Sequence, residues 1–328
     1  MMFYLLCAAL CLSVLFVVTA GASALCLLAA RSLSYRFDNI KPRTAANWLF
    51  AIRLLPVFTA CVVAFGFVLP AFLKLEPRST AEGMSLKLAT LALAGATLIV
   101  TVAMRIARSL QATAQVEGDW RRRSHELHMT GFSSPLYCVE GAFPFLAVTG
   151  LLRPRVYLGR PVVELLSPAE MQAALAHEMA HVRSFDNLKQ LLLKSLRWPG
   201  AFDSLIGGFS TWVHASEAAA DEEAVAAGAM ALDLSSALVK MGRIARGNIP
   251  TPQILASQFT PYAAASSLPT RIARLERLLE DGPPVVKIRP VGNGTIFALS
   301  LAAGILAYAA GINAILPWIH DALELLVR

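Results

Sequence analysis

Four long stretches without a charged residue constrain this sequence more than any other feature. They cover residues 1–30, 54–73, 88–104 and 291–319. A helix needs roughly 20 apolar residues to cross the hydrocarbon core of a bilayer, with about 17 as the lower limit. Only 16% of the residues are charged, against about a quarter in soluble domains. The sequence therefore predicts a multi-pass membrane protein with four transmembrane helices.

The first stretch has a competing interpretation as a cleaved signal peptide. Ala22-Ser23-Ala24 resembles a cleavage site, but no basic segment precedes the stretch and the apolar run continues to Ala30. A signal peptide normally begins with a basic segment and has a shorter apolar region. We therefore expect a retained membrane helix here.

The basic residues indicate the topology. The net charge is +7, and Lys and Arg gather beside the apolar stretches, chiefly in residues 31–43 and after residue 104. The positive-inside rule then places these two regions in the cytoplasm. Both termini and residues 73–87 would lie outside a cytoplasmic (inner) membrane. We expect membrane lipid as a partner of these charges and no direct binding of nucleic acid.

The expected fold is mostly α, with an inserted α+β domain. Residues 1–108 would hold three transmembrane helices with short loops, residues 109–290 a cytoplasmic domain, and residues 291–328 the fourth helix and a short tail. Polar helix 109–130 is expected to extend the third span. Short β-type runs at 136–139, 145–148 and 155–158 predict a small sheet. Further helices are expected at 168–198, 210–227, 231–246 and 271–279.

One helix carries the motif that points to chemistry. Ser167, Pro168 and Glu170 form a strong helix start, and His177-Glu178-Met179-Ala180-His181 follows. Two His residues four positions apart lie on one helix face, where both can bind a single Zn²⁺. Glu178 lies beside them and can take a proton from metal-bound water. The pattern therefore predicts a zinc-dependent hydrolase with Glu178 as the catalytic base.

A third metal ligand is expected on the next helix. Glu217 and Asp221 are also four positions apart, so they share a face. Catalytic zinc usually has three protein ligands and one open position, which Glu217 would complete. Asp221 would then accept the second ring N–H of a ligand His. The competing interpretation is a solvated acidic face, because Glu222 and Glu223 adjoin the pair.

Two further residues have less certain roles. His214 precedes Glu217 by one turn and is a candidate metal ligand, a donor to a transition-state oxyanion, or a solvent-facing side chain. Asp186 follows His181 by five residues. It could orient a ligand from outside the metal shell or form a salt bridge that stabilises its helix.

These residues resemble a known group. The run Leu175-Ala176-His177-Glu178-Met179-Ala180-His181, then Asp186 and Glu217-x-x-x-Asp221, is similar to the pattern of membrane gluzincins. Three apolar stretches before the motif and one after it resemble the BlaR/MecR-type antibiotic sensor-transducer family. Residues 150–158 also resemble that family's β-segment. Leu268-Pro269-Thr270-Arg271-Ile272 is similar to a motif of the HtpX and CaaX-protease relatives.

The resemblance implies a zincin-like (gluzincin) domain that is a zinc metalloendopeptidase. It implies zinc ligation by His177, His181 and Glu217, with Glu178 as general base and Asp221 as support for a ligand. Sensor-transducers carry a large extracellular ligand-binding domain after the fourth helix, whereas nine residues follow Ile319 here. The resemblance therefore does not extend to β-lactam sensing, and a signal would have to arrive through the short outer loop, the membrane helices or a partner.

The predicted function is proteolysis at the membrane, with a protein or peptide as substrate. The resemblance implies a repressor-type regulator as that substrate, in signal transduction, and an exposed sheet edge within 136–158 could align it. A protease of the HtpX type for quality control of membrane proteins is one alternative. A non-catalytic signalling scaffold that keeps zinc for stability is another. The substrate's identity and the oligomeric state stay open.

Overall fold

The structure is a computed structural model that describes residues 2–33, 40–77, 84–128, 135–141, 144–151, 153–197, 208–245, 256–258, 268–281, 308, 311–319 and 321. The chain divides into two compact units. Unit 1 comprises Met1–Ser32, Ala51–Val102 and Lys287–Arg328. Unit 2 comprises Leu33–Phe50 and Ala103–Val286. Two long helices, α2 (Pro42–Cys61) and α4 (Leu86–Arg122), run from one unit into the other.

Among the described residues, three helical segments are long and apolar enough to cross a membrane. They are Met2–Cys26 of α1 (Met2–Leu33), the run Pro42–Leu75, and α4. The second run consists of α2, a π-helical turn (Val62–Val68) and α3 (Leu69–Leu75). The first segment overlaps the predicted span at 1–30, and the other two contain the predicted spans at 54–73 and 88–104. The fourth prediction, at 291–319, falls mostly outside the described residues, of which only 308 and 311–319 belong to it.

Close helix packing forms the core of unit 1. Leu6 and Leu10 of α1 pack against Phe72 of α3 and Leu88 of α4. Gly95 permits this approach, because a Cβ atom built there would lie 2.2 Å from the backbone oxygen of Leu12. Small residues at contacts of this kind let membrane helices approach closely.

The sheet of unit 2 has the strand order β1-β2-β4-β3-β5. Its strands are β1 (Ser124–Leu127), β2 (Leu136–Val139), β3 (Leu146–Thr149), β4 (Arg155–Gly159) and β5 (Ala256–Gln258). The β2–β4 pair is parallel and the other pairs are antiparallel. The three predicted strands all lie inside this sheet. The expectation of an exposed edge within 136–158 is therefore wrong, because β1 pairs with the outer edge of β2 and β5 pairs with the outer edge of β3.

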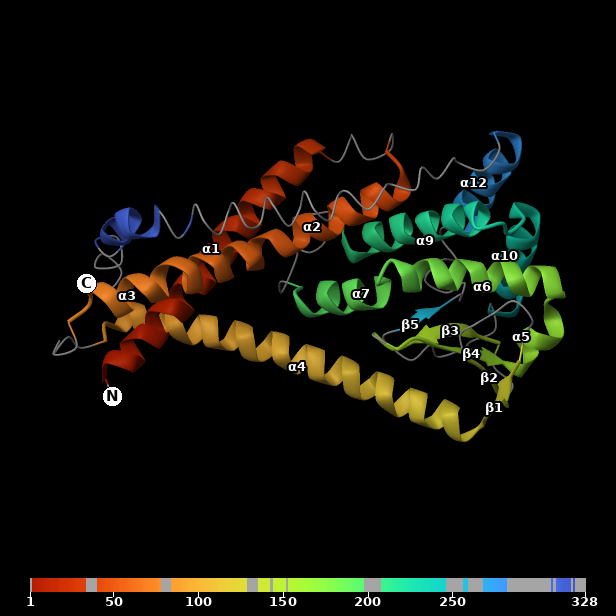
Figure 1. Ribbon diagram of the computed structural model, residues 1–328, viewed down its shortest axis with the longest axis horizontal. Helices are drawn as coiled ribbons and strands as arrows, with labels where there is room; N and C mark the ends of the chain where they lie inside the picture. The colour runs from red at the N-terminus through yellow and green to blue at the C-terminus, as the bar shows by residue number, and fades with distance from the viewer. Residues whose placement is uncertain are drawn as a thin grey trace. The chain divides into compact units, whose positions relative to one another are not determined.

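Besides the segments of α2 and α4, further described helices belong to unit 2 (Figure 1). They are α5 (Arg160–Leu165), α6 (Pro168–Arg183), α7 (Asp186–Ser195), α9 (Gly208–Ala226), α10 (Ala231–Ala245) and α12 (Leu268–Asp281). On one face, α6 lies between the sheet and α9, and its Leu175 belongs to the main core with Leu158 of β4 and Leu234 of α10. On the other face, Val116 and Trp120 of α4 pack against Ala147 of β3. Because α6 has neighbours on several sides, it can bury polar groups that a surface helix would expose.

Two expectations about helix boundaries are wrong. The helix predicted at 168–198 ends at Arg183, and a separate helix, α7, begins at Asp186. Phe185 between them has φ of 54°, a left-handed conformation that an α-helix cannot contain. The helix predicted at 109–130 ends at Arg122, and residues 124–127 instead form β1 because β2 pairs with them.

Candidate metal centre

The first turn of α6 is held by a capping box. The Ser167 side chain accepts a hydrogen bond from the Glu170 N–H, and the Glu170 carboxylate accepts one from the Ser167 N–H at 2.8 Å. This exchange satisfies backbone donors that a helix N-terminus leaves unpaired. It confirms the helix start predicted from the sequence. Because the start is fixed, the motif residues two to three turns later keep a defined orientation.

The structure brings His177, His181 and Glu217 together. The two Nε2 atoms of the His residues lie 3.3 Å apart. Glu217 of α9 lies opposite, with its carboxylate oxygens 3.5 Å from His177 Nε2 and 3.6 Å from His181 Nε2. Each residue offers one ligand atom to a group that could hold a metal ion. Glu178 is fully buried on the same helix.

These distances fit zinc. Ligands at about 2.0–2.1 Å from Zn²⁺ with tetrahedral angles are separated from one another by roughly 3.3–3.4 Å. The separation of the two Nε2 atoms, 3.3 Å, agrees with that value, and each Nε2 has a different Glu217 oxygen within a few tenths of an ångström of it, Oε2 at 3.5 Å from His177 and Oε1 at 3.6 Å from His181. Two imidazole nitrogens and one carboxylate oxygen are also a ligand set that zinc accepts in catalytic sites. The donor set thus matches Zn²⁺ in both chemistry and spacing.

His177 belongs to one series of linked polar contacts, here named the Asp221 branch (His177, Asp221 and Arg271). Its Nδ1 lies 2.9 Å from Asp221 Oδ1. Arg271 of α12 donates to both oxygens of Asp221, at 2.8 and 2.6 Å, and to Glu217 at 2.8 Å. All three members of the branch are buried. The carboxylate of Asp221 therefore orients His177, and Arg271 balances the negative charge.

Charges in this branch shift several pKa values. Burial alone would lower the pKa of His177, but Asp221 and Glu217 outweigh burial and raise this pKa to about 9. Burial would raise the pKa of Glu217, yet Arg271 and the two His residues lower it to about 2. Asp221 shifts in the same direction, with Arg271 as the main opposing cause. Both carboxylates are therefore ionised at neutral pH, which favours a cation between the imidazoles.

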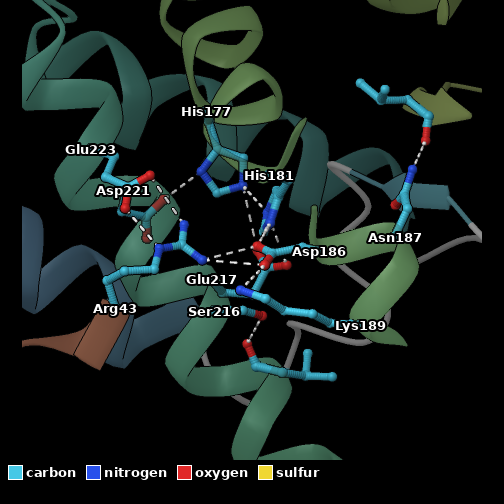
Figure 2. Close-up of polar contacts among 12 residues, drawn as sticks. Arg43, His177, His181, Asp186, Asn187, Lys189, Ser216, Glu217, Asp221 and Glu223 are labelled. Carbon is cyan, nitrogen blue, oxygen red and sulfur yellow. Dashed lines mark hydrogen bonds and ion pairs between the residues drawn. The ribbon is translucent and has the colours of Figure 1, made fainter. Parts of the chain in front are cut away.

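His181 belongs to a second series of linked polar contacts, here named the Asp186 branch (His181, Asp186 and Arg43). Its Nδ1 lies 2.8 Å from Asp186 Oδ2 at the start of α7. Arg43 of α2 donates to both oxygens of Asp186, at 3.2 and 3.1 Å. Burial raises the pKa of Asp186, but His181, Arg43 and Lys189 together lower it. Figure 2 shows the Arg43 guanidinium between the carboxylates of Asp186 and Glu223.

The left-handed turn at Phe185 makes the Asp186 branch possible. It ends α6 just after the motif and restarts the chain as α7, with Asp186 as the first residue. Asn187 then donates from its side-chain nitrogen to Val148 and Gly150 backbone oxygens at the end of β3. A bulky residue in this conformation is rare and persists only where its surroundings hold it. The turn therefore serves to place Asp186 against His181.

The other predicted residues lie as follows. Asp221 and Asp186 both contact a His of the motif. His214 is exposed on α9, and the group of ligand atoms found among the described residues does not include it. Its role stays a prediction.

Sequence reasoning assigned no role at the site to Arg43 or Arg271. The sequence predicts a topological charge at Arg43, and Arg271 belongs to the stretch Leu268–Ile272 that resembles the HtpX and CaaX-protease motif. The signal that could have found them is the number of carboxylates near the motif. Glu217, Asp221 and Asp186, once buried together, require cationic partners.

The family model for Peptidase family M48 matches residues 145–207. The matched stretch contains β3, β4, α5, α6 and α7, and thus His177, Glu178, His181 and Asp186. It covers less than half of the chain and ends before Glu217. No curated protein matches the chain. The match indicates a metallopeptidase domain, in line with the predicted gluzincin character, and the apolar helices indicate a membrane protein. The BlaR/MecR-type assignment stays a prediction.

Proposed function

We propose that this protein is a zinc-dependent endopeptidase of the cytoplasmic membrane that cleaves a protein substrate at the cytoplasmic face. The observation that carries the proposal is the meeting of ligand atoms from His177, His181 and Glu217, with Glu178 buried next to His177 in the sequence. The match to Peptidase family M48 over this stretch supports peptide-bond hydrolysis. The three apolar helical segments support a membrane location.

Each residue has a distinct task in this proposal. His177, His181 and Glu217 would hold Zn²⁺, which would supply Lewis-acid chemistry at a scissile carbonyl and would lower the pKa of water at the site. Glu178 takes the proton from the attacking water and passes it to the leaving amine. Asp221 and Asp186 fix the ring orientation of the two His residues and keep each Nε2 directed at the site. Glu178 is buried, so its carboxylate is shielded from bulk solvent.

The alternative of a structural zinc scaffold requires a fourth protein ligand, because structural sites are closed. In the described part of the chain, the ligand group contains three residues, and His214 is exposed. This arrangement favours an open, catalytic site. For the substrate, the resemblance favours a repressor-type regulator over damaged membrane proteins.

The decisive experiment compares the full-length protein with Glu178→Gln in cells. We expect the variant to retain zinc, measured by elemental analysis of the purified protein, and to lose proteolysis by at least about 100-fold, the scale of general-base catalysis. Quantitative proteomics of new N-termini would identify the substrate. A single regulator would support signalling, and many membrane proteins would support quality control.

Glu164→Gln is the matched control, because Glu164 is an exposed Glu of α5 that pairs with Arg160. It should behave as the unmodified protein. Cleavage by Glu178→Gln at the unmodified rate would show that Glu178 is not the base. Absence of zinc from the unmodified protein would refute the metal site itself.

A further inference from the structure

Arg43 makes an unusually complete set of contacts for a residue at a helix start. Its Nε and Nη2 donate to the two oxygens of Glu223, at 2.7 and 3.1 Å. Its Nη1 donates to both oxygens of Asp186. The planar guanidinium thus joins carboxylates of α9 and α7, as Figure 2 shows. A Lys side chain could not reproduce this fork, because its ammonium is a single point charge.

The position of Arg43 is not explained by the stability of α2. Arg43 is the second residue of the helix, and no acidic residue occupies the first turn. A cation at a helix N-terminus is unfavourable, because the helix dipole places positive charge there. The carboxylates of Asp186 and Glu223 compensate for this cost. The contacts of Arg43 therefore indicate a role in unit 2, beyond the topological role of a basic loop residue.

The first turns of α2 are packed against the same helices. Ala46 is fully buried with Leu193 of α7 and Trp212 of α9. Asn47 accepts a hydrogen bond at 2.9 Å from Lys189 of α7. This packing holds the Arg43 backbone in place, so the guanidinium meets Asp186 with little loss of conformational freedom. The contact between Arg43 and Asp186 is thus made by a helix that is packed in place, unlike an ion pair between two mobile surface side chains.

Arg43 reaches the metal centre through one carboxylate. Asp186 is buried and also accepts the hydrogen bond from His181 Nδ1. Without Arg43, the ammonium of Lys189 would remain beside Asp186, with its Nζ 3.6 Å from Asp186 Oδ1. The carboxylate could then rotate toward Lys189 and release His181. Groups that orient a metal ligand typically change metal affinity by about 10–100-fold when they are removed.

From these contacts we infer that Arg43 is a positioning residue of the metal centre, which holds Asp186 and, through it, the ring of His181. The inference rests on the proposed function, because it takes His181 as a metal ligand. It also has a consequence for regulation. Helix α2 continues from Arg43 through Ala51 into the apolar run that ends at Leu75. A rotation or shift of this helix would therefore move Arg43 and alter how firmly the site holds its metal.

The test measures metal binding by full-length protein in detergent or lipid nanodiscs. The variants are Arg43→Met, Arg43→Lys, Asp186→Asn and the double variant Arg43→Met/Asp186→Asn. Zinc affinity is measured by competition with a chromophoric chelator. The visible spectrum of the Co²⁺-loaded protein reports ligand geometry independently of catalysis. Arg160→Met is the matched control, since Arg160 also joins two carboxylates, Glu140 and Glu164, on an exposed surface.

Arg43→Met should bind zinc about tenfold more weakly and change the Co²⁺ spectrum. Arg43→Lys keeps the topological charge and should recover only part of the affinity. The double variant should bind no more weakly than Asp186→Asn, because Arg43 acts through Asp186. Arg160→Met should match the unmodified protein in both measurements.

Unchanged zinc affinity and an unchanged Co²⁺ spectrum in Arg43→Met would overturn the inference. Additive losses in the double variant would also overturn it, because they would show that Arg43 acts independently of Asp186. Full recovery of zinc affinity by Arg43→Lys would show that only the positive charge matters. It would contradict the role given to the planar guanidinium. These outcomes are separate from failure of the proposed function, which would appear as equal proteolysis by the unmodified protein and Glu178→Gln.

Discussion

The two branches of the metal centre use the same chemistry in different surroundings. In each, a His contacts a carboxylate, and an arginine from a distant segment contacts that carboxylate. The arginine side chain of the Asp221 branch is 6% exposed and comes from α12. That of the Asp186 branch is 20% exposed and comes from α2, which continues into an apolar segment. The first arginine is enclosed within unit 2, whereas the second also belongs to a candidate membrane helix.

The difference in exposure indicates that the Asp221 branch holds its His firmly, whereas the Asp186 branch can be changed more easily. A buried ion pair is costly to break, because removing one partner leaves an uncompensated charge in a low-dielectric environment. The Asp221 branch is therefore suited to keep His177 and Glu217 in a fixed arrangement. The Asp186 branch is closer to solvent, so its ion pair is weaker and easier to change. If His177 and His181 were held equally firmly, the two branches would not differ in this way.

The largest expected effect is that of Arg271→Met. It leaves Glu217 and Asp221 without their guanidinium, and the expected loss is about 3–5 kcal/mol in the free energy of unfolding of the metal-free protein. Chemical denaturation in detergent, followed by tryptophan fluorescence, measures this loss. Arg274→Met is the matched control on the same helix, because Arg274 pairs with Glu222 and is 40% exposed. Its loss should stay below about 1 kcal/mol. Equal losses in the two variants would remove the distinction between a buried and an exposed pair.

A smaller effect is expected from neutralising the carboxylates themselves. Asp221→Asn and Asp186→Asn each keep an oxygen that can accept a His N–H but lose the negative charge. We expect zinc affinity to fall by about 10–100-fold in each, with the greater loss in Asp221→Asn because that branch is less exposed. Chelator competition at constant pH measures both. A greater loss in Asp186→Asn would reverse the assignment of the firm and the adjustable branch.

The parts of the site that the sequence predicts are those set by spacing along a helix. His177 and His181 are four residues apart, as are Glu217 and Asp221, and helical geometry places each pair on one face. The cap at Ser167 was predictable for the same reason, since all its atoms lie within one turn. These predictions require no knowledge of which helices are neighbours.

The arginines could not be predicted in this way. Arg43 lies 143 residues from Asp186, and Arg271 lies 50 residues from Asp221. Only the packing of α2 and α12 against α7 and α9 brings them there. The break at Phe185 was also missed, because neither Gly nor Pro marks it and Phe has no preference for left-handed backbone. The contacts of Asp186 and Asn187 hold that turn, and they form only in the folded domain.

A third carboxylate–cation pair on α6 lies outside both branches of the metal centre. Its loss is expected to have the smallest effect on the protein. Glu170 lies on α6, and Lys240 of α10 donates to its carboxylate at 2.7 Å. Burial raises the pKa of Glu170, but Lys240, Ser236 and the Ser167 N–H outweigh burial and lower it from 4.5 to about 2. Because the pair contacts neither His, its loss should affect stability while leaving zinc affinity at pH 7 unchanged.

The sign of the pH dependence follows from the lowered pKa. Below the unfolded value, the unfolded chain binds more protons at Glu170 than the folded protein does, so stability falls as pH falls from 4.5 toward 2. The contribution at neutral pH is on the order of 1–3 kcal/mol. Subtracting the unfolding free energy of Glu170→Gln from that of the unmodified protein cancels the titration of the metal-centre carboxylates. The difference should shrink through this window. A constant difference from pH 6 to pH 3 would mean that Glu170 stabilises α6 only as an uncharged cap, leaving the two branches as the charge-dependent pairs of this helix.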